Sequence, residues 1–472
     1  MSRSVHKLMV GSLAALCSAC AVGPDYKRPE VASTAPFYKE DPAWAQAAPA
    51  DAAPKGEWWS VFSDPVLDDL LKRVEISNQT VAASAAAYAQ ARALVRESRA
   101  DMFPSVDLSA GATRSRTSGE STTSTTAGRV NNSYQVDIGA SWELDVWGRL
   151  RRSTENARAT AAADYADLIN ARLSAQGELA TDYFELRESD AEIDLVASTV
   201  EAYQRSLQIA QNRYDARIAA KTDLLQAQAQ LYSTQSTLEG LKSQRAKLEH
   251  AIAVLVGQAP ADFTLAKADW NMSVPEVPGV VPAQLLQRRP DIAAAERRVA
   301  AANATIGVSE AGYFPTLSLS GSLGSSSREA SQLFNSGTYL WSVGASLAQT
   351  LFQGGKVRAT VAASRAAYDQ TVATYRQTVL TAFQDVEDQL IALKVLQRQH
   401  ELRQLASSAA DEAEERTLNQ YREGIVGYSD VVTAQATALS DRTALIQAAR
   451  DLQTTTIALI QALGGGWETN KP

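Results

Sequence analysis

Residues 133–149 read SYQVDIGASWELDVWGR, and the sequence changes from one periodicity to another within this stretch. From Tyr134 to Val146 every second residue is apolar or small, which predicts a strand with one apolar and one polar face. From about Arg149 to Arg217 apolar residues recur three and four positions apart, in a run rich in alanine, leucine, glutamate, glutamine and arginine. This pattern predicts a helix of roughly 100 Å, given a rise of about 1.5 Å per residue.

The second half of the chain repeats the first half at an offset of about 207 residues. Identical residues mark the register: Gly148 and Gly355, Tyr214 and Tyr421, Asp223 and Asp430, Gly257 and Gly464. Upstream, Phe103-Pro104 corresponds to Phe314-Pro315. Because the residue before a proline is disfavoured in helical geometry, each pair is expected to end a helix and to open a strand. The sequence therefore predicts one structural unit used twice.

Each half contains two alternating segments joined by a polar loop, which predicts hairpins at about 104–147 and 315–352. A soluble sheet with one solvated face would show the same alternation. Strands of about ten residues and aromatic residues near the strand ends favour an outer-membrane barrel instead. Sheet edges in lipid leave backbone groups unpaired, and four strands cannot close a barrel. We therefore expect a homotrimer, because three chains supply twelve strands and leave room for a pore.

The N-terminus has the pattern of a secretory signal, with basic residues followed by a short apolar run and small residues before Cys20. The sequence at 17–20 resembles a bacterial lipobox, which predicts acylation of Cys20. The alternative is an ordinary cleaved signal with two incidental cysteines. Both cysteines of the chain, Cys17 and Cys20, lie in this region, so the mature protein has no cysteine for a disulfide, a thiolate nucleophile or a Cys-ligated metal.

Composition and motifs exclude other classes of function. The formal net charge is -8 and no long basic run is present, which argues against nucleic acid as a partner. His250 and His400 do not occupy equivalent positions of the repeat, and neither stands beside a ligand motif. The chain has no nucleophile, metalloprotease or nucleotide-binding motif in a suitable strand-to-helix context. We therefore expect no enzymatic activity, no cofactor and no metal site.

These patterns divide the chain into successive segments. The expected boundaries are a signal peptide at 1–19, a lipid-anchored N-terminal segment at 20–64, a first repeat at 65–257, a linker at 258–282, a second repeat at 283–464 and a tail at 465–472.

The chain resembles outer-membrane factors of the TolC family, nearest to the NodT-like lipoprotein branch that serves resistance-nodulation-division multidrug efflux systems. The motifs that carry the resemblance are GPDYKRP at 23–29, WW at 58–59 followed by Phe62, WELDVWGR at 142–149 and LLQRRPDI at 285–292. The resemblance implies an α+β fold with an internal two-fold repeat. A trimeric twelve-stranded β-barrel, with four strands per chain, would continue into a long α-helical barrel in the periplasm. A mixed α/β equatorial region would come from the residues before Asp64, the linker at 258–282 and the C-terminus.

The resemblance also implies a function. The protein would be an exit duct in the cell outer membrane, lipid-anchored and extending into the periplasm. Its partners would be a periplasmic adaptor protein, an inner-membrane pump of the resistance-nodulation-division type and outer-membrane lipid. It would passively export small molecules such as drugs. The alternative within the same architecture is a channel for type I protein secretion or for metal-ion efflux.

Two helix-turn-helix tips are the candidate functional site. The resemblance places a periplasmic gate at Asp430, Thr433, Tyr421, Asp223 and Thr222, where Asp430 would line the constriction and Tyr421 would bond to Asp223 or Thr222. It places adaptor contacts at Arg217, Ile218, Gly424, Ile425 and Gly427. Gly424 and Gly427 suit a turn that needs positive φ. The first tip departs from the pattern, because it has Arg217 where the second has Gly424. Helix-end and capping roles are the alternative for the gate residues.

Overall fold

The structure is a computed structural model, and it describes residues 21–30, 57–116, 130–268, 270, 272 and 289–465. The predicted signal peptide, Cys20, most of the expected linker and all of the C-terminal tail after Gly465 lie outside these residues. The chain forms two compact units. Unit 1 comprises Met1–Glu30, Tyr88–Asp164 and Ala295–Tyr375, and unit 2 comprises Val31–Ala87, Tyr165–Ala294 and Arg376–Pro472.

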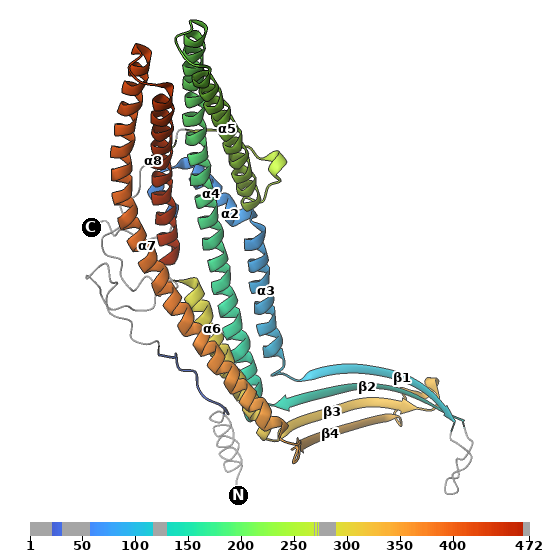
Figure 1. Cartoon of the computed structure of the whole chain (residues 1–472). Coiled ribbons are helices and arrows are strands. Elements are labelled where there is room, and N and C mark those ends of the chain that lie inside the picture. The colour runs from blue at the N-terminus through green and yellow to red at the C-terminus, as the bar shows by residue number, and fades with distance from the viewer. Residues whose placement is uncertain are drawn as a thin grey trace. The chain divides into compact units, whose positions relative to one another are not determined.

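Unit 1 contains one four-stranded antiparallel sheet, with the strands side by side in chain order (Figure 1). The strands are β1 (Ser105–Arg116), β2 (Val130–Leu144), β3 (Thr316–Ser327) and β4 (Tyr339–Ala348). They form the two predicted hairpins, and β2 also pairs with β3, so the hairpins join into a continuous sheet. In the described residues β1 and β4 each pair with one neighbour only.

The two faces of the sheet differ in polarity. One row across the sheet, Leu108, Ile138, Leu323 and Trp341, is apolar, and all four side chains are exposed in the single chain. On the other face, hydroxyl pairs cross the strands, with Ser105 and Ser141 2.8 Å apart and Ser322 and Ser342 also 2.8 Å apart. The apolar face is therefore a surface that water solvates poorly.

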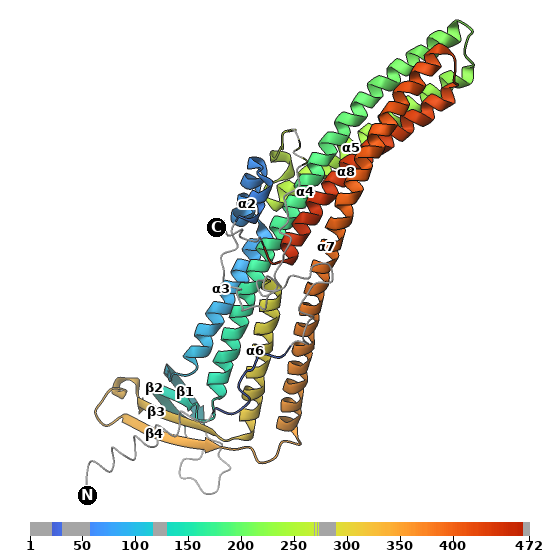
Figure 2. The same cartoon turned by 90° about the vertical axis from the view of Figure 1, so that its left-hand side faces the viewer.

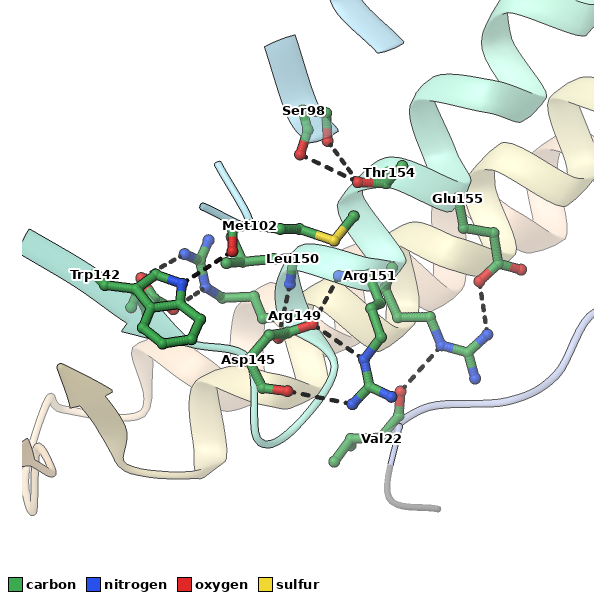
Figure 3. A network of polar contacts seen from close by, with 12 residues as sticks. Val22, Ser98, Met102, Trp142, Asp145, Arg149, Leu150, Arg151, Thr154 and Glu155 are labelled. Carbon is green, nitrogen blue, oxygen red and sulfur yellow. Dashed lines mark hydrogen bonds and ion pairs between the residues drawn. The ribbon is translucent and has the colours of Figure 1, made fainter. Parts of the chain in front are cut away.

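The predicted alternation extends slightly too far along β2. The strand ends at Leu144 and not at Val146, because Asp145 takes part in the start of the following helix. Its carboxylate accepts from the backbone N–H of Leu150 at 3.0 Å and of Arg151 at 2.9 Å. These are first-turn donors that have no partner within the helix. Figure 3 shows Asp145 against these residues.

Seven α-helices are described: α2 (Pro65–Ser77), α3 (Gln79–Ala100), α4 (Arg149–Asp215), α5 (Lys221–Leu255), α6 (Pro290–Glu310), α7 (Lys356–Glu423) and α8 (Tyr428–Ala462). Short 3-10 helices lie at Trp58–Phe62, Pro260–Asp262, Ala311–Tyr313 and Ala330–Gln332. The helix predicted from Arg149 to Arg217 is α4, which ends at Asp215. None of the helices in the described part of the chain combines the length and the apolar character needed to cross a membrane.

The repeat seen in the sequence is also present in the backbone. Gly148 and Gly355, 207 residues apart, precede α4 and α7 with φ of 83° and 85°. Gly257 and Gly464 follow α5 and α8 with φ of 71° and 82°. Each pair occupies the left-handed region that favours glycine. The two halves therefore begin and end their helix pairs with the same turns.

A cluster of ion pairs in unit 2 joins α4 and α5 to the start of the expected linker. Asp190 accepts from Arg187 at 3.2 Å and from Arg245 at 2.7 Å. Arg245 also donates to the carbonyl of Leu265 at 2.7 Å, and the N–H of Leu265 donates to Glu249 at 2.6 Å. The linker therefore begins in contact with α4 and α5.

Arg289, from the motif at 285–292, connects three helices of unit 2. Arg289 donates to Asp291 at 2.8 Å, to Asp385 on α7 at 3.0 Å and to the carbonyl of Ala462 at the end of α8 at 3.1 Å. Its guanidinium connects the first residues of α6 to both long helices of the second repeat within unit 2. Ion pairs of this kind with several oxygens per guanidinium are specific to arginine geometry.

Candidate functional site at the two helix turns

Two turns of unit 2 contain all the predicted gate and adaptor-contact residues, and they lie beside each other at the ends of the α4–α5 and α7–α8 pairs (Figure 2). In the first turn the N–H of Arg217 donates to the carbonyl of Tyr214, and the N–H of Ile218 to that of Arg213, both at 2.9 Å. The residues 207 positions later make the same two bonds at 3.0 and 2.9 Å. Both helices thus end in the same Schellman-type motif, which satisfies their last carbonyl groups.

The difference between the turns lies in the residue that occupies the left-handed position. Gly424 has φ of 80°, and Arg217 has φ of 58°. Arg217 therefore adopts the geometry of the second turn although it has a Cβ, which costs roughly 1–2 kcal/mol for an L-residue. Gly427 was expected to need positive φ, and this expectation is wrong: its φ is -78°, because it is the N-cap of α8 and not a turn residue.

The outermost apolar side chain of each turn is an isoleucine. Ile218 is 69% exposed and Ile425 is 67% exposed, at equivalent positions of the repeat. Single exposed apolar residues are common on proteins. Here, however, two exposed isoleucines from equivalent turns lie at the same end of unit 2.

Asp430 has both an exposed position and a capping contact. It is the third residue of α8, and its carboxylate accepts from the N–H of Gly427 at 3.2 Å. A carboxylate at this position satisfies a free helix donor and lies at the positive end of the helix dipole. Thr433, one turn later, is also exposed, and its hydroxyl donates to the carbonyl of Ser429 at 3.0 Å. Asp430 therefore caps α8, as the alternative interpretation expects, and its side chain remains exposed to solvent.

Tyr421 is the clearest break in the symmetry of the repeat. It is 2% exposed, whereas its counterpart Tyr214 is 37% exposed. The ring of Tyr421 packs edge-on against Tyr428, with the ring centroids 5.2 Å apart. Its hydroxyl is buried and has no hydrogen-bond partner among the described residues, so the expected bond to Asp223 or Thr222 is not formed in this structure. Burial raises the pKa of the Tyr421 hydroxyl, while the nearby Arg213 opposes the rise and Asp223 adds to it.

Sequence reasoning missed Arg213, which connects the two turns. Its Nη1 donates to the carbonyls of Tyr421 at 3.0 Å and of Arg422 at 3.3 Å, at the end of α7. Its guanidinium also lies over the ring of Tyr421, 4.7 Å from the centroid. A cation that bonds the last carbonyls of a helix is favoured by the helix dipole. The signal in the sequence is a mismatch: the position equivalent to Arg213 is Gln420, so only one half has this cation.

Two polar atoms of this contact are buried without a partner in the described residues, the hydroxyl of Tyr421 and Nε of Arg213. Most buried polar groups in native proteins are hydrogen-bonded. The contact between the turns is therefore well packed but incompletely bonded.

Comparisons with known proteins agree with the expected architecture. A family model described as outer membrane efflux protein matches residues 70–258 and again 281–465. The chain is 30% identical to the probable efflux pump outer membrane protein TtgC of Pseudomonas putida, covering 99% of this chain and 96% of that protein. It is 28% identical to the outer membrane protein OprJ of Pseudomonas aeruginosa, covering 97% and 95%. The solved structure of the outer-membrane channel OprN superposes with a TM-score of 0.84 at 31% identity, covering 95% of this chain and 100% of that one.

Proposed function

The chain belongs to the family of outer membrane efflux proteins, and we propose that three copies of it form the exit duct of a tripartite efflux pump. Members of this family are outer-membrane channels and conduct transport, and this chain is an outer-membrane component of an efflux pump. We propose in addition a homotrimer, a periplasmic adaptor and an inner-membrane pump as partners, a lipid anchor at Cys20 and a gate at the two helix turns.

The sheet of unit 1 is the observation that carries the proposal. It has an exposed apolar face, a polar face lined with hydroxyl groups, and edge strands β1 and β4 that each pair with one neighbour among the described residues. A sheet with free edges is not tolerated in hydrocarbon, because each unpaired backbone group costs several kcal/mol. A β4 edge of one copy and a β1 edge of the next satisfy each other, and three copies give the twelve strands expected above. The hydroxyl-lined face then surrounds an aqueous pore.

The two helix turns supply the gate. Asp430 is exposed near the start of α8, one turn before Thr433, and three copies of Asp430 around one axis create a negative potential that favours cations. Arg213 and Tyr421 hold the α4–α5 and α7–α8 pairs together behind this ring. Opening then requires the two helix pairs to separate, which breaks the Arg213 contacts.

The exposed isoleucines, Ile218 and Ile425, are the adaptor contacts. The partner they fit is a periplasmic adaptor with apolar pockets at its tip, because two apolar side chains per copy give six anchors on a trimer. Arg217, Gly424 and Gly427 fix the backbone that presents them. The adaptor in turn connects the duct to an inner-membrane pump of the resistance-nodulation-division type, which selects small molecules such as drugs.

The anchor is an acyl group on Cys20, which lies outside the described residues. One acyl chain buries methylenes at about 0.8 kcal/mol each, so it adds to the attachment that the sheet provides. The protein is thus placed in the cell outer membrane and reaches into the periplasm.

Accumulation assays in a deletion strain test the proposal. Loss of the gene should raise retention of a fluorescent drug, and the wild-type gene should restore efflux, whereas retention of metal ions and of type I secreted proteins should not change. Equal drug retention with and without the gene would contradict drug efflux. A defect confined to metal ions or to protein secretion would assign the duct to the alternative systems.

A further inference from the structure

Residues Ala21–Arg28, which we name the N-terminal strap, lie against the rest of unit 1, and seven of their polar groups have a partner there. The strap begins beside the base of the sheet, where the N–H of Val22 donates to the carbonyl of Trp147 at 2.9 Å. Arg152 of α4 donates through Nε to the carbonyl of Val22 at 3.3 Å. Figure 3 shows Val22 beside the first turns of α4.

Arg152 serves the next residues of the strap as well. Through Nη2 it donates to the carbonyl of Gly23 at 3.2 Å and to the carboxylate of Asp25 at 2.9 Å. Its other nitrogen pairs with Glu155 at 2.8 Å. The Arg152 side chain is only 7% exposed. Without the strap, this guanidinium keeps a single described partner, and a buried charge that loses its partners is strongly destabilising.

The rest of the strap contacts two other helices of the unit. On α6, Asn303 donates to the carbonyl of Pro24 at 2.8 Å, and Glu296 accepts from the hydroxyl of Tyr26 at 2.5 Å. On α7, the hydroxyl of Tyr375 accepts from Arg28 at 3.2 Å. The strap therefore joins α4, α6 and α7.

Glycines lie on both sides of the contact between the strap and the helices. Gly23 has φ of +99°, and a Cβ on it would lie 2.4 Å from the Cα of Gly307. A Cβ on Gly307 would lie 2.9 Å from Cγ of Arg152 and 2.9 Å from the carbonyl oxygen of Val22. A Cβ on Gly148 would lie 2.9 Å from the Cα of Ala21. Backbone approaching backbone this closely requires glycine.

We propose that unit 1 contains a binding site for an extended peptide and that its ligand is the chain's own N-terminal strap. Docking of the strap fastens α4, α6 and α7 together and holds Ala21, the residue after Cys20, beside Gly148. The fastening acts whether or not Cys20 carries an acyl group. The part that concerns the position of an acylated terminus rests on the proposed function.

Two glycine variants test the docking in the full-length protein. Gly307→Ala places a methyl group against the Val22 carbonyl oxygen and against Arg152, the side chain that binds the strap. Gly240→Ala is the matched control, because it also replaces a mid-helix glycine but has nothing within 4 Å of its Cβ. Alanine favours a helix over glycine, so neither change should weaken its own helix. We expect trypsin to cut at Lys27 about tenfold faster or more in Gly307→Ala, because proteolysis follows the population of the undocked segment. Equal cleavage in the two variants would overturn the proposal.

A second experiment removes the ligand and adds it back. Residues 22–28 are replaced by a glycine-serine segment of the same length, with Cys20 and Ala21 retained, and a synthetic peptide of residues 21–29 is then added. The thermal midpoint of the variant should fall by several degrees and should rise again in a saturable way with the peptide but not with a scrambled one. An unchanged midpoint, or a folded variant that does not respond to the peptide, would contradict the binding site. Neither readout depends on drug efflux, so failure of the strap and failure of the efflux proposal are distinguishable.

Discussion

The guanidinium of Arg213 lies 4.7 Å from the ring centroid of Tyr421 and donates to the backbone carbonyl of the same residue at 3.0 Å. One side chain thus holds both the ring and the last turn of the other helix pair. The equivalent residue in the second half of the repeat is Gln420, which carries no charge. The contact is therefore made by the first half alone.

Arg213→Ala should loosen the turns and raise channel conductance. The variant loses a cation–π contact and two bonds to carbonyls, which together contribute on the order of 2 kcal/mol. We expect single-channel conductance in planar bilayers to increase several-fold. Arg205→Ala, which removes an exposed arginine two turns earlier on α4, is the control and should leave conductance unchanged. Equal conductance of Arg213→Ala and the wild type would mean that Arg213 does not restrict opening.

Asp430→Asn should reduce cation preference without disturbing the helix end. Asparagine keeps an oxygen that can accept from the N–H of Gly427, so the cap at 3.2 Å is preserved while the charge is removed. We expect the reversal potential in a salt gradient to move toward zero selectivity. Asp215→Asn, an exposed carboxylate at the end of α4, is the matched control. If both variants retain the selectivity of the wild type, Asp430 does not line the constriction.

Arg217→Gly should stabilise the first turn. The structure holds Arg217 at φ of 58°, in the left-handed region where glycine has no Cβ penalty. Replacement should therefore add about 1 kcal/mol to the free energy of unfolding, seen as a higher thermal midpoint. Gly424→Ala at φ of 80° is the reciprocal variant and should lower the midpoint by a similar amount. A lower midpoint for Arg217→Gly would show that the arginine side chain makes stabilising contacts that outweigh its strained backbone.

Much of this site follows from the sequence, and the remainder depends on differences between the halves. The repeat and its periodicities predict the strands, the long helices and both turns, because hydrophobic patterning and glycine positions act locally. The surroundings of equivalent residues differ between the halves. Tyr214 and Tyr421 match in sequence, yet only Tyr421 is buried. The Arg213 contact and the cap at Gly427 depend on which groups meet in space, and no local pattern encodes this.

Glu188→Gln should remove a pH dependence of stability. Burial raises the pKa of Glu188 to about 7, with Arg450 opposing the rise and Glu192, Asp451 and Glu185 adding to it. A carboxyl whose pKa is higher in the folded state binds a proton on folding, so wild-type stability should fall as pH rises from about 4.5 to 7.

The change is bounded at about 3 kcal/mol by the size of the shift. Relative to Glu188→Gln, the wild type should therefore lose thermal stability across that window, and Glu239→Gln, an exposed glutamate of α5, should behave as the wild type. Parallel curves for wild type and Glu188→Gln would show that Arg450, 3.1 Å away, fully compensates the buried charge.

The internal repeat predicts the strand register between neighbouring copies. β3 follows β1 by 211 residues, as Pro315 follows Pro104, and β4 follows β2 by 207, as Gly355 follows Gly148. Applied to the pair Ser105 and Ser141, these offsets give Thr316 and Ala348, which is the observed pair. Applied to the pair Gly139 and Ser322, they place Ser346 of one copy opposite Gly111 of the next.

Cysteines at Ser346 and Gly111 should therefore form a disulfide between copies. Both positions are exposed on the polar face of free edge strands, and nothing lies within 4 Å of a Cβ at Gly111. A disulfide requires Cα atoms about 4.4–6.8 Å apart, and a shift of two residues adds about 7 Å. The pair of Ser346→Cys with Thr113→Cys should therefore not crosslink. Preferential crosslinking of that shifted pair would show a different register, and a trimer that crosslinks in neither pair would show that β4 and β1 do not form the seam.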